Sequence, residues 1–138
     1  MDVPPLSSIT SLKIYDACKC HNKTDKLINI RDLDLTKLEN LEVLLFRDCL
    51  NLTKLPANAF VTAPNLKVLD LEDNNLTDVN QNALKGLRNL EFIDLTDNGH
   101  LKILPDGFFE DTPAIAKINI SETALRYNLI TSHIASSK

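Results

Sequence analysis

The chain has 138 residues, the size of one domain, and 43% of its residues are hydrophobic. Three glycines, no tryptophan and a formal net charge of −4 are typical of a globular protein and exclude a collagen-like or disordered chain. The sequence pI near 5.3 also argues against nucleic acid and anionic membranes as partners, because binding to phosphate groups depends on clustered Lys and Arg.

The N-terminal stretch MDVPPLSSIT has no charged segment followed by an apolar run, so we expect no signal peptide in this sequence. Apolar runs elsewhere are far shorter than the ~20 residues needed to cross a bilayer. If the protein is secreted, we expect that its signal has already been removed.

An apolar pattern of the form L-x-x-L-x-L-x-x-N recurs along the chain. In chain order, its copies begin at residues 9, 41, 66, 90 and 115, so we predict five coils. The first coil is the longest, because its strand is expected at Leu12 and Ile14 and the next copy begins at Leu41. Two coils continue with the motif L-P-x-x-x-F, as "LPANAF" at 55–60 and "LPDGFF" at 104–109.

This frame resembles the leucine-rich repeat family over nearly the entire chain. The L-P-x-x-x-F motif resembles the typical animal extracellular class, as in Toll-like receptors. The resemblance implies an α/β solenoid that forms a single domain over residues 1–138. Such a solenoid has a short parallel β-sheet on its concave face and an irregular or short helical convex face.

Each coil is expected to contribute one short strand whose side chains alternate between the core and solvent. Leu69 and Leu71 then face the core, and stacked coils bury one another's leucines. Asn74 and Asn98 are expected to hydrogen-bond backbone groups where the chain leaves the sheet. We call this position the ladder site. Cys49 and Thr123 occupy the ladder site with weaker donors.

The outward strand positions predict the binding surface. Val, Leu and Phe at these positions have no local structural reason to be exposed, and charged residues surround them, as in protein-binding surfaces. The predicted ligand-binding residues are Tyr15, Val43, Leu45, Arg47, Val68, Asp70, Glu72, Phe92 and Asp94. Isolated exposed apolar residues are also ordinary, which is the alternative interpretation.

An acidic residue follows each predicted strand, in the column Asp16, Asp48, Asp73, Asp97 and Glu122. One interpretation is a stripe that binds a cation or a basic peptide. We favour a structural interpretation, in which each carboxylate accepts hydrogen bonds from backbone N–H groups of its turn.

Three cysteines occur, at Cys18, Cys20 and Cys49. Neighbouring coils lie ~5 Å apart, within the usual range for a disulfide, so Cys49 is expected to bond one of the other two. The sequence does not decide which one. A zinc site from Cys18, Cys20, His21 and Cys49 has suitable ligand types but a weak spacing, and a fully reduced set is a further alternative. We predict no metal and no cofactor.

Four N-x-[ST] sequons, at Asn22, Asn51, Asn75 and Asn119, are glycosylation candidates in a secreted protein. Asn22 is the best of them, because it lies in a hydrophilic insertion and owes nothing to the repeat. Asn119 falls on the concave sheet, where a glycan would block binding.

No nucleophile has a placed base and no glycine-rich phosphate loop occurs, so we predict that the protein is not an enzyme. The resemblance implies an extracellular recognition module or decoy in immunity that binds a protein or peptide on the concave sheet. The alternative is an intracellular adaptor with a cytoplasmic location. We also predict a homodimer formed through open solenoid ends, unless end segments cover them or the chain is part of a longer solenoid.

Overall fold

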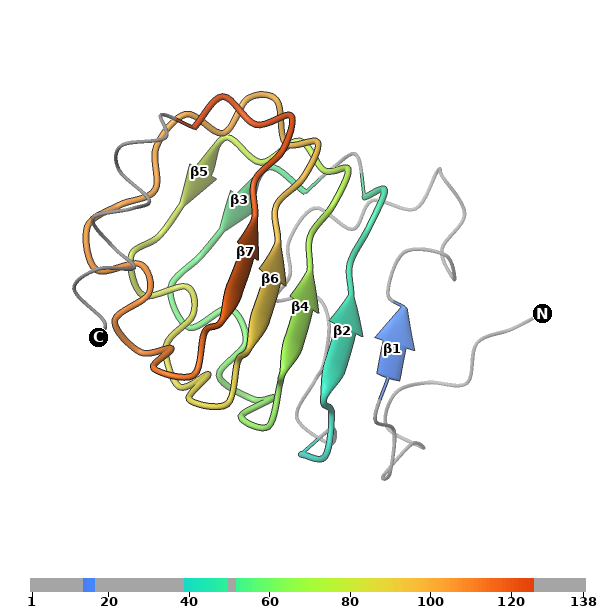
Figure 1. Cartoon of the computed structure of the whole chain (residues 1–138), viewed down its shortest axis with the longest axis vertical. Helices are drawn as coiled ribbons and strands as arrows, with labels where there is room; N and C mark the ends of the chain where they lie inside the picture. Colours follow the sequence, from blue (N-terminus) through green and yellow to red (C-terminus); the bar gives the residue numbers. More distant parts are fainter. Residues whose placement is uncertain (1–13, 17–38, 50–51, 126–138) are drawn as a thin grey trace.

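The computed structural model of the chain describes residues 14–16, 39–49 and 52–125, which form a stack of coils (Figure 1). Several predicted residues lie outside this part, namely Ile9, Leu12, Cys18, Cys20, His21, Asn22 and Asn51. The predictions made for them therefore stay predictions.

One strand from each coil enters a five-stranded parallel sheet. The strands are β1 (Ile14–Asp16), β2 (Val43–Leu45), β4 (Val68–Asp70), β6 (Phe92–Asp94) and β7 (Lys117–Asn119), in that spatial order. From β2 to β7, Leu44, Leu69, Ile93 and Ile118 lie side by side, as do Val43, Val68, Phe92 and Lys117. The repeat frame predicted to begin at 41, 66, 90 and 115 aligns the same residues as this strand pairing. We call the outward surface of this sheet the sheet face; it corresponds to the predicted concave face.

The register of the first strand differs from the prediction. Tyr15, not Leu12, pairs with Leu44, and Ile14 pairs with Val43. The predicted frame, Ile9-x-x-Leu12-x-Ile14, competes with Leu12-x-x-Tyr15-x-Ala17, which has the same spacing. The shift is three residues, an odd number, so it exchanges the two faces of the strand. Tyr15 therefore shares its register position with Leu44 of the core column, and its assignment to the ligand-binding surface stays a prediction.

A second, smaller parallel sheet lies on the opposite, convex side of the coils (Figure 1). It consists of β3 (Lys54–Leu55) and β5 (Asp78–Val79), with Leu55 beside Val79. Turns make up the rest of this side, and residues 39–49 and 52–125 contain no helix. The convex side is thus irregular with a short sheet, and the short helices that the resemblance allowed do not form in this part.

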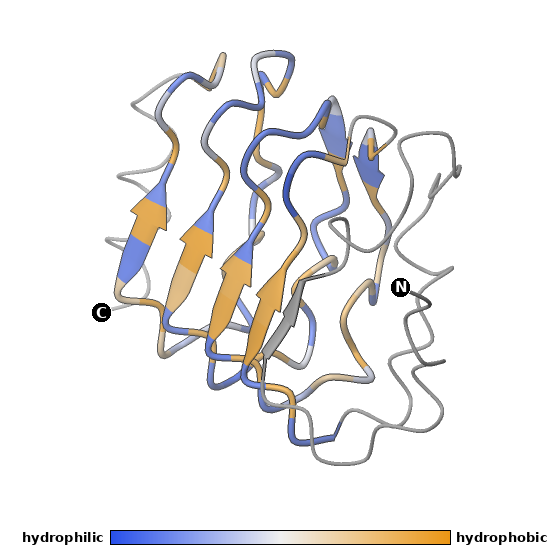
Figure 2. Cartoon of the chain, turned by 90° about the vertical axis from the view of Figure 1, so that its right-hand side faces the viewer, coloured by the Kyte–Doolittle hydropathy of each residue, from blue (hydrophilic) through white to orange (hydrophobic). Residues whose placement is uncertain are grey.

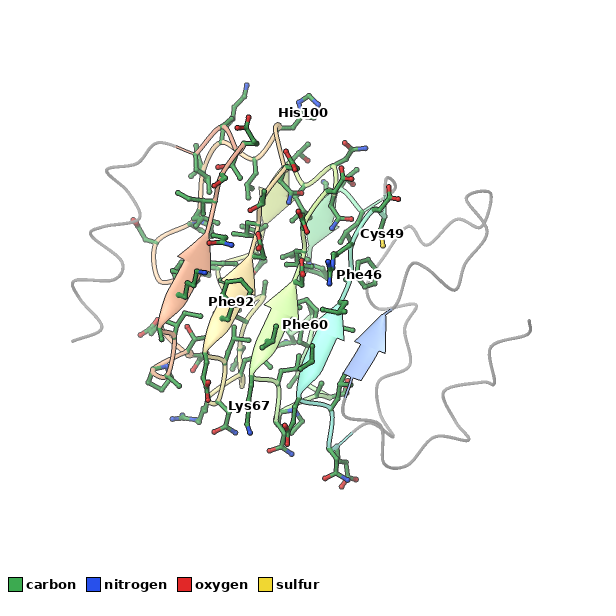
Figure 3. All side chains as sticks on the ribbon, turned by 45° about the vertical axis from the view of Figure 1, so that its right-hand side comes forward. Phe46, Cys49, Phe60, Lys67, Phe92 and His100 are labelled. Atoms are coloured by element: carbon green, nitrogen blue, oxygen red, sulfur yellow. The ribbon has the colours of Figure 1, made fainter. Side chains whose placement is uncertain are left out.

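The core runs through the stack between the two sides. Most leucines of the repeat are fully buried, and Phe46, Phe60 and Phe108 are the largest fully buried side chains of the core. Figure 3 shows Phe46 and Phe60 inside the coils and Phe92 on the sheet face. In the last coil Ile115, Ile118 and Ile120 are only half-buried, because within the described part they have a neighbouring coil on one side.

The buried asparagines connect each coil to the preceding one. The Nδ2 of Asn74 donates to the carbonyl of Phe46 at 2.7 Å, and its Oδ1 accepts from the N–H of Cys49 at 3.1 Å. Asn98 repeats this arrangement with the carbonyl of Leu71 at 2.9 Å and the N–H of Leu76 at 3.1 Å. The predicted role of the ladder asparagines is confirmed.

The acidic column has a different structural cause from the predicted one. Asp48, Asp73, Asp97 and Glu122 all have positive φ angles, of 54°, 56°, 56° and 52°. Left-handed backbone is costly for most residues and tolerated best by Gly, Asn and Asp. Each of these four coils thus leaves the sheet through one residue with left-handed backbone, and we call this residue position the left-handed step. Asp16 does not share this position, because its register partner is Leu45.

Candidate protein-binding face

The sheet face consists of three columns of outward side chains on β2, β4, β6 and β7 and just beyond them. Figure 2 shows that β2, β4 and β6 are mostly hydrophobic, that β7 is hydrophobic only at its centre, and that hydrophilic residues lie at the tips of β4, β6 and β7. The described residues of the sheet face are Val43, Leu45, Arg47, Val68, Asp70, Glu72, Phe92, Asp94, Thr96, Lys117, Asn119 and Ser121.

Four apolar side chains form a contiguous patch on this face: Val43, Leu45, Val68 and Phe92. All four are half-buried, so each keeps part of its surface in water. Val68 pairs with Val43 on one side and with Phe92 on the other, which makes them a continuous row. The Nζ of Lys117 lies 5.4 Å from the centre of the Phe92 ring, and this cation–π contact ends the row.

Arg47 and Asp70 form the polar border of the patch. The Nε of Arg47 lies 3.0 Å from Oδ2 of Asp70, and its Nη1 lies 3.8 Å from Oε2 of Glu72. The other oxygen of Asp70, Oδ1, accepts from the N–H of Glu72 at 3.1 Å. Both oxygens of Asp70 are thus occupied, and the guanidinium is held beside the patch with almost half of its side-chain surface exposed.

Asp94 repeats this arrangement one coil later with different partners. Its Oδ1 accepts from the N–H of Thr96 at 2.9 Å, and its Oδ2 accepts from Nδ2 of Asn119 at 2.9 Å. Burial opposes ionisation, but the hydrogen bonds from Thr96 and Asn119 and the nearby charge of Lys117 outweigh it. The pKa of Asp94 is therefore held below its ordinary value.

The structure describes the side chains of eight of the nine predicted ligand-binding residues, all except Tyr15, and brings these eight together on neighbouring strands. It also shows how strongly Asp70 and Asp94 are tied to the fold, which alternation alone does not reveal. Lys117 and Asn119 were not assigned to the site, although they continue its columns. The repeat frame already indicated both residues, because it places Lys117 beside Phe92 and Asn119 beside Asp94.

The remaining candidates are the cysteines, the sequons and any metal site. The predicted disulfide of Cys49 with Cys18 or Cys20 stays a prediction, because both possible partners lie outside the described residues. Among the sequons, Asn75 is half-buried, and the amide of Asn119 bonds Asp94. Within the described ranges, no group of three metal-ligating side chains is arranged to hold an ion. A groove of about 610 Å³ on the convex side is lined by β3, β5, residues 80–82 and Pro105, and it was not predicted.

A leucine rich repeat family model matches residues 39–99, which include β2 to β6. Together with the parallel sheets, this match supports a leucine-rich repeat family and a repeat solenoid. A search of the curated proteins found no match. The described residues include no helix that is long and apolar enough to span a membrane. Leucine-rich repeat domains generally bind other proteins and typically lack catalytic activity.

Proposed function

We propose that the chain is a non-enzymatic recognition module that acts outside the cell, as a receptor part or decoy in immunity, and binds a protein or peptide on the sheet face. The observation that carries this proposal is the contiguous row of half-buried apolar side chains beside a fixed guanidinium. Apolar and aromatic residues next to an exposed Arg are the usual centre of a protein interface.

Pre-organisation supports the choice of this face. Arg47 is held by Asp70, and Lys117 is held over Phe92. Ordering these long side chains before a ligand arrives reduces the entropy lost on binding.

The five strands give a face only about 19 Å wide at ~4.8 Å per strand. A standard interface takes ~800 Å² from each partner, so the ligand is a short peptide or also contacts the rim.

The extracellular location rests on separate observations. The disulfide predicted for Cys49 and the sequon at Asn22 are both typical of the secretory pathway. The alternative is an intracellular adaptor that docks a protein through the same face. The mass of protein from its native source, measured before and after reduction and deglycosylation, separates the two. A free thiol at Cys49 with no glycan would favour the adaptor.

The binding face is tested by photo-crosslinking in native extracellular fluid. A photoreactive amino acid in place of Phe92 is expected to capture a protein, and one in place of Lys85, which lies outside the sheet-face columns, is the control. Phe92→Ala is expected to weaken the captured partner's binding by ~2 kcal/mol, or about thirtyfold. The convex variants Lys85→Ala and Arg88→Ala are expected to bind normally. Capture through position 85 alone would place the working face on the other side.

A further inference from the structure

Negative charge is concentrated where the strands of the sheet face end. The segments 45–49, 70–74, 94–98 and 119–123 contain seven carboxylates and one guanidinium, a net charge of −6. The whole chain has −4, so all other residues together carry +2, the difference between −4 and −6. The net negative charge of this protein therefore lies at one edge of its sheet.

The fold explains only part of this charge. Asp70 and Asp94 are hydrogen-bonded, and Arg47 neutralises one of them. The left-handed step at Asp48, Asp73 and Asp97 requires a tolerant backbone, which Asn or Gly supplies equally well without a charge. These three carboxylates are exposed, and within the described part they accept no hydrogen bond and form no ion pair.

A row of unpaired carboxylates thus runs parallel to the apolar row, one residue of each per coil. Both rows run from coil to coil, and neighbouring residues of a row are separated by the ~4.8 Å spacing of paired strands. A metal ion is a poor occupant, because the described residues offer no three-ligand group. Residues three and four apart on a helix are 5–6 Å apart, close to the coil spacing. The long stems of Lys and Arg can reach beyond an apolar contact to place their charges on carboxylates.

We propose that the ligand of the sheet face presents a basic amphipathic helical segment of a protein. Its apolar side chains contact Val43, Val68 and Phe92, and its Lys or Arg side chains lie against Asp48, Asp73 and Asp97. This inference rests on the proposed function and specifies the chemistry of the partner. The opposite edge of the strands is mixed in charge, since Lys67 lies 3.5 Å from Glu42. The basic side of the helix is therefore expected to face the edge that holds Asp48, Asp73 and Asp97.

The probe is a fluorescent helical peptide of about 18 residues with a Leu stripe and a Lys stripe, and its control has Gln in place of Lys. At about 50 mM salt the full chain is expected to bind the Lys peptide about tenfold more tightly, with a difference that shrinks as salt rises. The combined variant Asp48→Asn, Asp73→Asn, Asp97→Asn keeps residues that tolerate the left-handed step, and it is expected to lose about tenfold in affinity.

The matched control is Asp78→Asn, Glu110→Gln, Asp111→Asn, which removes the same charge outside the sheet-face columns and is expected to bind within about twofold of the wild type. Failure of the wild-type chain to bind the Lys peptide, or equal loss in both triple variants, would overturn the inference. Capture of an acidic partner through position 92 would also overturn the inference, but it would leave the proposed function intact. Absence of any protein crosslinked there would instead remove the proposed function.

Discussion

The coil that contains β6 and the last coil, which contains β7, share one sequence pattern but are joined to their neighbours in different ways. Asn98 bonds the carbonyl of Leu71 and the N–H of Leu76, both in the preceding coil. At the same site of the last coil, the hydroxyl of Thr123 donates only to Ile120 of its own coil, at 2.6 Å. The last coil is therefore attached mainly by its strand, through bonds such as Leu95 N–H to Asn119 O at 2.9 Å.

Burial differs in the same direction. Leu69 and Ile93 are completely buried between coils, whereas Ile118 in the same column is half-buried. A coil is stable because its neighbours bury its apolar residues, as in other repeat proteins. The sequence pattern of a coil therefore does not by itself give the coil its stability. Four sets of substitutions, ordered from the largest expected effect to the smallest, test this conclusion.

The largest effect is expected in the core column. Leu69→Ala leaves a cavity between two coils and should lower the free energy of unfolding by about 3–5 kcal/mol. Ile118→Ala removes a similar volume from a half-buried site and should cost only about 1–2 kcal/mol. Urea unfolding monitored by circular dichroism measures both. Equal losses would mean that the last coil is covered as well as the central ones.

The ladder site gives the next largest effect. Asn98→Ala leaves the N–H of Leu76 without its buried partner and removes one of the two hydrogen bonds to the carbonyl of Leu71, which should cost about 2–3 kcal/mol. Thr123→Ala should cost no more than about 1 kcal/mol. The reverse change, Thr123→Asn, should slow hydrogen exchange of the amides in β7. If Thr123→Ala is as damaging as Asn98→Ala, the proposed difference between the coils is wrong.

The left-handed step provides a smaller test. Asp73→Ala places a poorly suited residue at a φ of 56° and should cost about 1 kcal/mol, whereas Asp73→Asn should be nearly neutral. In the last coil the same step is made by Glu122, which lacks a short side chain. Glu122→Asn should therefore raise the melting temperature slightly, by an amount equivalent to about 0.5 kcal/mol. Thermal unfolding of the three variants measures this, and destabilisation by Glu122→Asn would contradict it.

The smallest effect concerns Asp94, which links the two coils through Asn119. Because its pKa is lowered in the folded state, its stabilising contribution is complete above the ordinary Asp pKa of about 3.9. This contribution is lost as the pH falls through the lowered pKa. In the Asp94→Asn variant, the free energy of unfolding should therefore decrease less steeply than in the wild type as the pH falls from about 5 to about 2. Asp97→Asn removes the same charge without this link to Asn119 and is the matched control.

Much of the fold was predictable because the repeat appears several times in one chain. Alignment of Leu44, Leu69 and Ile93 sets a register that every other position then follows. The same repetition placed most of the sheet face correctly. The amide ladder was also predictable, because a buried polar residue beside a strand end needs backbone partners.

The first coil could not be placed in the same way. Two apolar sets with equal spacing overlap at Leu12, and a long insertion removes the fixed distance to the next coil. The local pattern then fits either face, and only pairing with β2 distinguishes them. The left-handed step was missed for another reason. An acidic residue suits both a hydrogen-bonded turn and a positive φ, and composition does not separate these causes.

The second sheet determines how the stack bends. Curvature in a solenoid requires the coils to be farther apart on one side than on the other. Where β2 and β4 are paired in front and β3 and β5 are paired behind, both sides keep the ~4.8 Å spacing of hydrogen-bonded strands. We therefore expect this part of the solenoid to curve little, and any stronger curvature to begin beyond β5, where the rear sheet ends. A ligand is then expected to meet a nearly flat surface at Val43 and Val68 and a more curved one from Phe92 onward.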